Sequence, residues 1–396
     1  MATKRGDGGE GAAARKRRPK GANGLGGASL RADGLWQWRV TLADGRRVSA
    51  TAKTQDEARR KCLDKAGLAE QGVDLKATRQ TLGAFLERWL EDVVRPNAAP
   101  KTYASYRDTC RRHIVPALGH VEIGRLKPAD VQRLIRLKQG EPSRLGTPLS
   151  ARSVAYVRTV LVVALNHAVR FDVVPRNVAA VTVPPRQARA ERVPLTPEQV
   201  RVFLRAVEGD RLEALYRVTA AYGLRLGEGL GLRWADLDLD AGTLRVRQAV
   251  QRVDGRLMLN EPKTEKSKRT LALAPALVAS LRSHRRRQAE ERLAARRWDD
   301  RGLVFTNGAG GPLEPANVLR AFKAHLSAAG LPAQRFHDRR HYAATFLLAE
   351  GVPARVVMDI LGHSQISTTM DIYGHVLPAA HRDVAERVER FLAEPG

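Results

Sequence analysis

The chain has 396 residues, too many for one ordinary domain, and its 43% hydrophobic residues suffice for a sizeable core, which excludes a wholly disordered protein. It carries 68 Lys and Arg against 42 Asp and Glu, a formal net charge of +26. So basic a surface repels itself unless a polyanion neutralises it, which indicates nucleic acid as the partner, with an acidic membrane surface as the alternative.

Several features favour a reducing cytoplasm over export or a membrane. The two cysteines, Cys62 and Cys110, cannot build a disulfide framework, and neither lies in a CxxC pair. No run approaches the roughly 20 apolar residues of a membrane span, and the N-terminus lacks an apolar signal core. Residues 1–30, rich in glycine and basic side chains, predict a flexible basic tail that is either only solvated or touches DNA.

Residues 31–75 predict a small ββα unit. Apolar and polar side chains alternate from Trp36 to Leu42, as in a strand with one buried face, and Thr54 with Glu57 forms a capping box at a helix start. A two- or three-stranded sheet with basic outer positions can enter the major groove of DNA, while the opposite face builds the core. The DNA-contact candidates in this unit are Arg39 and Arg59.

Residues 78–182 predict a small helical bundle. Apolar residues recur with helical spacing in four segments, which begin near Leu82, Lys101, Pro128 and Ala151. One side of the bundle is basic, and such a face is either only solvated or contacts DNA. The candidates on this face are Arg107, Arg111 and Arg112.

A linker and a last domain follow the bundle. Residues 183–194, with consecutive prolines, predict an extended basic linker, and its Arg186 is a further DNA-contact candidate. Thr196, Pro197 and Gln199 then cap a new helix. We expect residues 195–396 to be mainly helical with a strand insertion. The expected strands are 243–247, 257–261 and 269–273, the last two joined by a polar turn, and the longer helices are 275–297, 315–329, 338–350 and 354–361.

Four clusters in the last domain carry side chains suited to phosphate chemistry. In chain order they are Ala221 to Glu228, Lys263, His337 to His341, and Leu361 to His363 with Tyr373. Arg225 lies between glycines at a predicted helix start, where it can meet a phosphate, although a structural Arg225–Glu228 pair explains it equally well. The i, i+3 spacing places His337 and Arg340 on one helix face.

These clusters, in this order, resemble the tyrosine site-specific recombinases, also called the phage integrase family. The family signature is an Arg in a G-L-R-x-G-E box, a hairpin Lys, an H-x-x-R box, an L-G-H and a nucleophilic Tyr, and each has a counterpart here. His363 follows Arg340 by 23 residues and Tyr373 follows His363 by 10, which fits the family spacing. The resemblance implies a mainly α multidomain fold with small sheets: an arm-binding unit, a SAM-like core-binding domain and a mixed α/β catalytic domain.

The resemblance also implies how the cationic residues act. Arg225 and Arg340 would clamp the scissile phosphate, since a guanidinium is always charged and can bond two oxygens at once. Lys263 would protonate the leaving 5′ oxygen as a general acid. His363 would donate a hydrogen bond to a non-bridging oxygen. With the charge carried by these side chains, no metal and no other cofactor is expected.

The remaining implied roles concern the nucleophile and its surroundings. Tyr373 would form a covalent 3′-phosphotyrosine, which stores the bond energy so that no ATP is required. His337 would assist the proton transfer, and Glu228 would orient the site without reacting. The C-terminal tail has apolar residues at helical spacing and would either pack against its own protomer or dock on a neighbouring protomer in a tetramer.

The chain departs from the family pattern at Arg339, Tyr342 and Gly229, none of which removes a catalytic group. Arg339 stands where an apolar residue is usual, and H-x-x-R selects Arg340. A rival hypothesis is a zinc pair, because His337 and His341 have the i, i+4 spacing of helix-borne ligands. The intervening Asp338 and the two arginines speak against it, since adjacent cations repel a metal ion.

We therefore expect an integrase that cuts and rejoins double-stranded DNA at core and arm attachment sites of a phage or another mobile element. It would act as a homotetramer, with a host bending factor and an excisionase as helpers. Two alternatives remain: a Xer-like resolvase or type IB topoisomerase-like enzyme, with the same chemistry but no arm binding, and a catalytically silent DNA-binding protein. The complete residue set argues against the silent protein, and the extra N-terminal unit argues against a simple resolvase.

Overall fold

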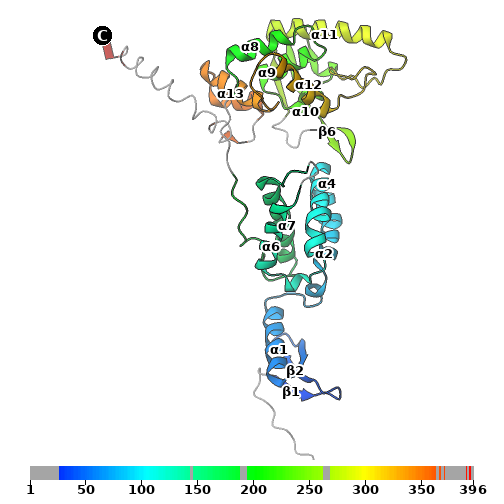
Figure 1. The fold of residues 1–396 in the computed structure, drawn as a ribbon, viewed down its shortest axis with the longest axis vertical. Helices are drawn as coiled ribbons and strands as arrows, with labels where there is room; N and C mark the ends of the chain where they lie inside the picture. Colours follow the sequence, from blue (N-terminus) through cyan, green and yellow to red (C-terminus); the bar gives the residue numbers. More distant parts are fainter. Residues whose placement is uncertain are drawn as a thin grey trace, which may run out of the picture. The chain divides into compact units, whose positions relative to one another are not determined.

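The structure, a computed structural model, describes residues 26–142, 146–187, 194–261 and 268–362, with the single residues 365, 366, 370, 389, 392 and 393. Its internal contacts divide the chain into two compact units: residues 1–98 with 105–187, and residues 188–396 with the short segment 99–104. Figure 1 shows the helices and strands of each unit. No helix in these described ranges is long and apolar enough to cross a bilayer.

The first unit begins with a three-stranded antiparallel sheet that a helix covers on one face (Figure 1). Its elements are β1 (Gly27–Leu30), β2 (Trp36–Thr41), β3 (Arg47–Ala52) and α1 (Gln55–Glu70). The helix begins at Thr54, whose hydroxyl accepts a hydrogen bond from the Glu57 N–H at 3.3 Å, and Val40, Val48 and Cys62 close the core. The alternating pattern did not indicate β1, because backbone pairing with β2 holds this strand while its Leu30 stays exposed.

A helical bundle completes the first unit, apart from the first residues of its helix α4 (Pro100–Thr109), which fall in the segment 99–104. Two of its helices each contain a π-helical turn, which widens the helix by one residue: α2 (Leu82–Arg88), η2 (Trp89–Val94) and α3 (Arg95–Asn97) are continuous, as are α4 (Pro100–Thr109), η3 (Cys110–Ile114) and α5 (Val115–Leu118). The others are α6 (Pro128–Gly140) and α7 (Ala151–Arg170), with short turns η1 (Ala77–Arg79) and η4 (Ile123–Arg125). The four expected helices are therefore present, and fully buried Leu82, Ile114, Leu134 and Leu161 form their core.

Two small sheets lie in the second unit. One has the order β4 (Leu237–Asp238), β5 (Thr243–Val246), β8 (Arg269–Ala272), and the other is a hairpin of β6 (Ala249–Val253) and β7 (Arg256–Asn260). The expected strands are present, but the expectation that 257–261 and 269–273 form one hairpin is wrong. β7 pairs with β6, a strand that the sequence did not indicate, and β8 returns to pair with β5.

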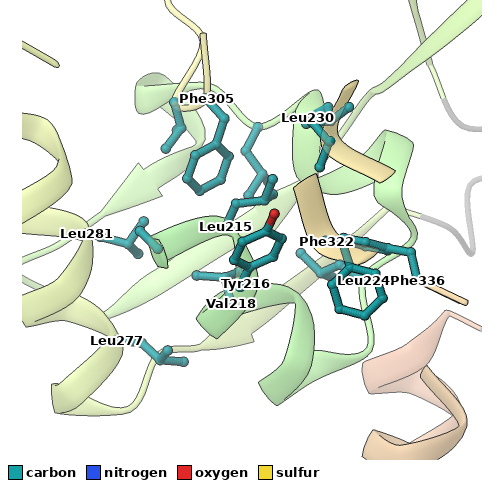
Figure 2. Close-up of a cluster of buried hydrophobic side chains, with 14 of the residues drawn as sticks. Leu215, Tyr216, Val218, Leu224, Leu230, Leu277, Leu281, Phe305, Phe322 and Phe336 are labelled. Carbon is teal, nitrogen blue, oxygen red and sulfur yellow. The ribbon is translucent and has the colours of Figure 1, made fainter. Parts of the chain in front are cut away.

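Helices surround these sheets and enclose the core of the second unit. They are α8 (Pro197–Ala206), α9 (Glu213–Tyr222), α10 (Leu226–Leu230), α11 (Pro275–Ala294), α12 (Pro315–Ala328), α13 (Asp338–Ala349) and α14 (Ala354–Leu361), with the turn η5 (Trp234–Asp236). At α8, Thr196 and Gln199 form the expected reciprocal capping box. Figure 2 shows Leu215 and Tyr216 of α9 at the centre of the core, between Leu281 of α11 and Phe322 of α12. Contacts of α9 with both α11 and α13 make it the central helix of the unit.

Candidate active site

Arg225 lies in the tight turn between α9 and α10. Gly223 ends α9 in the left-handed conformation, with φ of 57°, and a Cβ at this position would lie 2.6 Å from Leu361 Cδ2 and 3.2 Å from Arg340 Cα. Only glycine allows so close an approach of α13 and α14 to this turn. Arg225 is the N-cap residue of α10, and its side chain stays 43% exposed, so part of the guanidinium is open to a ligand.

Arg340 reaches the same turn from α13. It is buried, and its Nη1 donates a hydrogen bond to the Gly223 carbonyl oxygen at 2.9 Å. Burial, followed by the charge of Arg225, lowers the pKa of Arg340 to about 9. The two arginines of the expected phosphate clamp are 115 positions apart in the sequence and are thus brought to the same turn.

His337 is the N-cap residue of α13, one helical turn before Arg340. Burial, followed by the neighbouring cations His341, Arg340 and Arg225, lowers the pKa of His337 below its ordinary value. The imidazole is therefore neutral at pH 7 and able to accept a proton. The ring of His341 stands edge-on to it at 5.7 Å, and no group of three His, Cys, Asp or Glu side chains arranged for a metal occurs among the described residues.

Glu228 binds two arginines at the back of the site. One carboxylate oxygen, Oε1, accepts from Arg225 Nη1 at 2.6 Å, and Oε2 accepts from the Arg225 backbone N–H at 3.1 Å and from Arg269 Nη2 at 2.9 Å. Burial alone would raise the pKa of Glu228, but Arg269 and Arg225 hold it below its ordinary value, so the carboxylate is charged. The Arg225–Glu228 pair therefore leaves Arg225 partly exposed, and the two explanations of Arg225 are compatible.

Arg269 is the residue of this site that sequence reasoning missed. It is the first residue of β8 and has 7% of its side chain exposed. Besides Glu228 it binds the Ile360 carbonyl oxygen at the end of α14, through its Nε at 2.7 Å. The only signal in the sequence was its place directly after the basic turn that contains Lys263.

The three departures from the family pattern each have a structural explanation. Arg339 points into the core, where its guanidinium carbon lies 3.4 Å from the Phe336 ring centroid, whereas Arg340 reaches the Gly223 turn. A Cβ on Gly229 would lie 3.0 Å from both Leu215 and Thr219 of α9, so glycine lets α10 pack closely. Tyr342 stacks on Phe346, and burial raises its pKa, the opposite of what activates a phenol nucleophile.

Three expected catalytic residues, Lys263, His363 and Tyr373, lie outside the described residues. The described chain ends beside the first two, at Glu261 and Lys268 around Lys263, and at Gly362 before His363. Their assignment therefore remains the prediction made on the motifs.

The DNA-contact candidates of the first unit lie on more than one surface. Arg39 is on the exposed face of the sheet, where its Nη2 binds Gln37 Oε1 at 2.7 Å, and Arg47 of β3 lies on the same face. Arg59 lies on α1, with its guanidinium 5.5 Å from the Trp38 ring centroid, on the opposite side of the sheet. Arg39 and Arg59 therefore lie on opposite faces of the sheet, and a DNA duplex seated on one face contacts one of them.

The candidates of the bundle and the linker are mostly exposed. Arg107 and Arg112 both pair with Asp108, at 3.2 and 3.5 Å. Arg111 is exposed beside them on η3, and Arg186 is exposed in the extended segment 183–187. The Arg112–Asp108 pair is about half exposed and contributes little to folding, so Arg112 can exchange Asp108 for a phosphate at small cost, whereas the Arg107 side chain is partly buried.

Comparisons with known proteins agree with this geometry. The profile described as "Phage integrase family" matches residues 194–380, and the profile "Phage integrase, N-terminal SAM-like domain" matches residues 81–137. A "Tyrosine recombinase XerC-like" protein of Caldanaerobacter subterraneus subsp. tengcongensis is 30% identical over 386 residues, covering 89% of this chain and 96% of its own. An integrase of Streptomyces ambofaciens is 30% identical over 379 residues, covering 90% and 93%.

Solved structures share the fold. An integrase of transposon Tn1549, in complex with a circular intermediate DNA, superposes with a TM-score of 0.66 at 21% identity, covering 78% of this chain and 99% of its own. A lambda integrase tetramer bound to a Holliday junction gives a TM-score of 0.54 at 18% identity, covering 90% and 96%. The matching family profiles and the relatives that are 30% identical show that the chain belongs to the phage integrase family of tyrosine recombinases, the enzymes that cut and rejoin DNA strands.

Proposed function

We propose that this enzyme integrates and excises a phage or another mobile element, with Arg225 and Arg340 as the clamp on the scissile phosphate. The observation that carries the proposal is the meeting of these two arginines at the Gly223 turn, one partly exposed and one buried. A buried cation beside a solvent-facing one is positioned before the substrate arrives. Such preorganised donors typically lower a barrier by about 3–4 kcal/mol each.

In the cleavage step the Tyr373 oxygen attacks the scissile phosphorus and the bond from phosphorus to the 5′ oxygen breaks. A phenol has an ordinary pKa of about 10, so its proton must pass to an acceptor as it attacks, and the neutral His337 is suited to take it. Lys263 donates a proton to the leaving 5′ oxygen, and His363 binds a non-bridging oxygen. Rejoining reverses these transfers, with the free 5′ hydroxyl of the partner strand as the nucleophile.

The DNA-binding surfaces are assigned by the same proposal. The exposed face of the β1–β3 sheet, which carries Arg39 and Arg47, contacts arm sites. The arginines Arg107, Arg111 and Arg112 contact core DNA together with the catalytic unit. The lambda relative forms a tetramer on its junction, and we propose the same assembly here, linked through the C-terminal tails. A host bending factor and an excisionase belong to the same proposal.

A substitution of Tyr373 tests the proposed chemistry, with Tyr342→Phe as the matched control. The substrate is a nicked duplex made from the junction sequences of the element that carries the gene, so that cleavage releases a short strand and traps the adduct. Wild type and Tyr342→Phe should give a denaturant-resistant protein–DNA band, and Tyr373→Phe should bind the duplex without forming that band. An adduct in Tyr373→Phe, or its loss only in Tyr342→Phe, would contradict the assignment.

A Xer-like resolvase remains a second candidate, because the Caldanaerobacter relative bears a XerC-like name. The two activities differ in their need for the first 75 residues. Recombination that depends on arm DNA and on this segment supports the integrase. Efficient resolution of two short core sites without this segment supports the resolvase.

A further inference from the structure

Arg269 makes contacts to two segments that carry expected catalytic residues. Its Nη2 lies 2.9 Å from Glu228 Oε2, and both side chains are 7% exposed. Its Nε donates to the Ile360 carbonyl oxygen at 2.7 Å, in the last turn of α14. A charged group that is nearly excluded from water needs such partners, and Arg269 therefore holds this geometry firmly.

The neighbouring backbone is shaped around the Arg269 guanidinium. Gly362 ends α14 with φ of 65°, and a Cβ there would lie 2.9 Å from Arg269 Nη1. The Gly362 carbonyl oxygen in turn lies 3.4 Å from Arg225 Nη2. Arg225 thus contacts Glu228 and the end of α14, and Arg269 contacts the same two groups.

We propose that Arg269 is a positioning residue that sets the orientation of the Arg225 guanidinium toward the scissile phosphate, without touching the DNA itself. Glu228 has two oxygens to share between two arginines. By binding Oε2, which also accepts the Arg225 backbone N–H, Arg269 leaves Oε1 as the oxygen that holds Arg225 Nη1 at 2.6 Å and keeps the other guanidinium nitrogens of Arg225 off the carboxylate. Without Arg269, Oε2 would lose its charged donor and would draw a second guanidinium nitrogen of Arg225 inward, because a buried carboxylate that loses a charged partner is costly. The inference rests on the proposed role of Arg225.

Arg269→Gln and Arg269→Lys test this role, with Arg282→Gln as the matched control. Arg282 also pairs with a carboxylate, Asp240 at 2.6 Å, but in an exposed position in the same unit. Each variant is assayed as the full chain on the nicked duplex, by DNA affinity and by single-turnover adduct formation at saturating DNA. Two substrates are compared, the natural phosphodiester and a methylphosphonate at the scissile position, which lacks the negative non-bridging oxygen that Arg225 neutralises.

Arg269→Gln should slow adduct formation on the phosphodiester by about 30-fold or more while DNA affinity changes by less than about 2-fold. On the methylphosphonate the loss should fall below about 5-fold, because the neutral phosphorus centre depends less on a guanidinium. Arg269→Lys should recover part of the rate, and Arg282→Gln should match wild type. In a Glu228→Gln background, Arg269→Gln should reduce the rate of adduct formation little further, because Arg269 acts through the Glu228 carboxylate.

Equal slowing on both substrates, or full additivity with Glu228→Gln, would overturn the positioning role and leave Arg269 with a general structural one. An unchanged rate in Arg269→Gln would overturn it as well. If Arg269→Gln fails to fold, as seen by a lost cooperative melt, Arg269→Lys supplies the same comparison between the two substrates. Failure of the proposed function is distinguishable, because wild type would then form no adduct on the phosphodiester.

Discussion

Replacing Arg339 with methionine should stabilise the catalytic unit without stopping cleavage. Arg339 is 5% exposed, and its three guanidinium nitrogens have no hydrogen-bond partner among the described residues. Its only compensation is a box of aromatic rings, whose centroids lie 3.4 Å (Phe336), 4.6 Å (Phe322) and 5.4 Å (Tyr216) from the guanidinium carbon. A methionine is unbranched and apolar and adapts to irregular space in a core, although it is shorter than arginine and leaves part of the guanidinium space unfilled.

The expected gain follows from two opposing terms. Burial lowers the pKa of Arg339 from 12.5 to about 9, which corresponds to roughly 5 kcal/mol against the charged form. A desolvated cation over an aromatic face recovers about 2 kcal/mol, and the closest ring, Phe336, contributes most of it. The difference is about 3 kcal/mol, and the space that the shorter side chain leaves unfilled reduces it. Arg339→Met should therefore raise the free energy of unfolding by about 1–3 kcal/mol, within the roughly 1–4 kcal/mol seen when buried ion pairs are replaced by apolar side chains.

Urea unfolding of wild type and Arg339→Met, monitored by tryptophan fluorescence, measures this difference. Phe336→Leu in both backgrounds completes a double-mutant cycle. Loss of the Phe336 ring should lower the free energy of unfolding by about 1–2 kcal/mol more when Arg339 is present than when methionine replaces it. Adduct formation by Arg339→Met should stay within about 3-fold of wild type, whereas Arg340→Met should abolish it. Destabilisation of Arg339→Met by more than about 2 kcal/mol would refute the reasoning, because Arg339 would then have partners that offset its burial.

Two further predictions concern proton transfer and DNA binding. Because the pKa of His337 is lowered, the ring stays neutral below pH 6.5, and the rate of adduct formation should fall only at more acidic pH, where His337 gains a proton. His337→Gln should form the adduct more slowly and should lose this decrease at acidic pH. The same decrease in both proteins would contradict the assignment. Arg39→Gln should weaken arm-DNA binding and reduce the slope of log affinity against log salt concentration by about one, whereas Arg59→Gln on the opposite face should change neither quantity. Gel-shift titrations at several salt concentrations measure both quantities. The reverse result would place the DNA on the helix side of the first unit.

The sequence by itself determined the features that depend on residues a few positions apart. The helix over 151–170, the capping box of Thr196 and Gln199 and the glycine turn around Arg225 all appear where the sequence predicts them. Their signals, which are periodicity, caps and glycines, act within one or two helical turns. The ordered motifs identified the family for the same reason, since each is a short local pattern, and the predictions for Lys263, His363 and Tyr373 still rest on it.

The tertiary structure decided which distant groups meet. Arg269 and Glu228 are 41 positions apart, and no local pattern relates them, so their shared burial became visible only once β8 lay against α10 and α14. The pairing of β8 with β5 instead of β7 also depends on distant contacts. The local pattern of such short strands does not specify which strand pairs with which, and packing of the surrounding core decides it. The H-x-x-R pattern had selected Arg340 over Arg339, but only the structure showed what each of them contacts: aromatic rings surround Arg339, and Arg340 binds the Gly223 carbonyl oxygen.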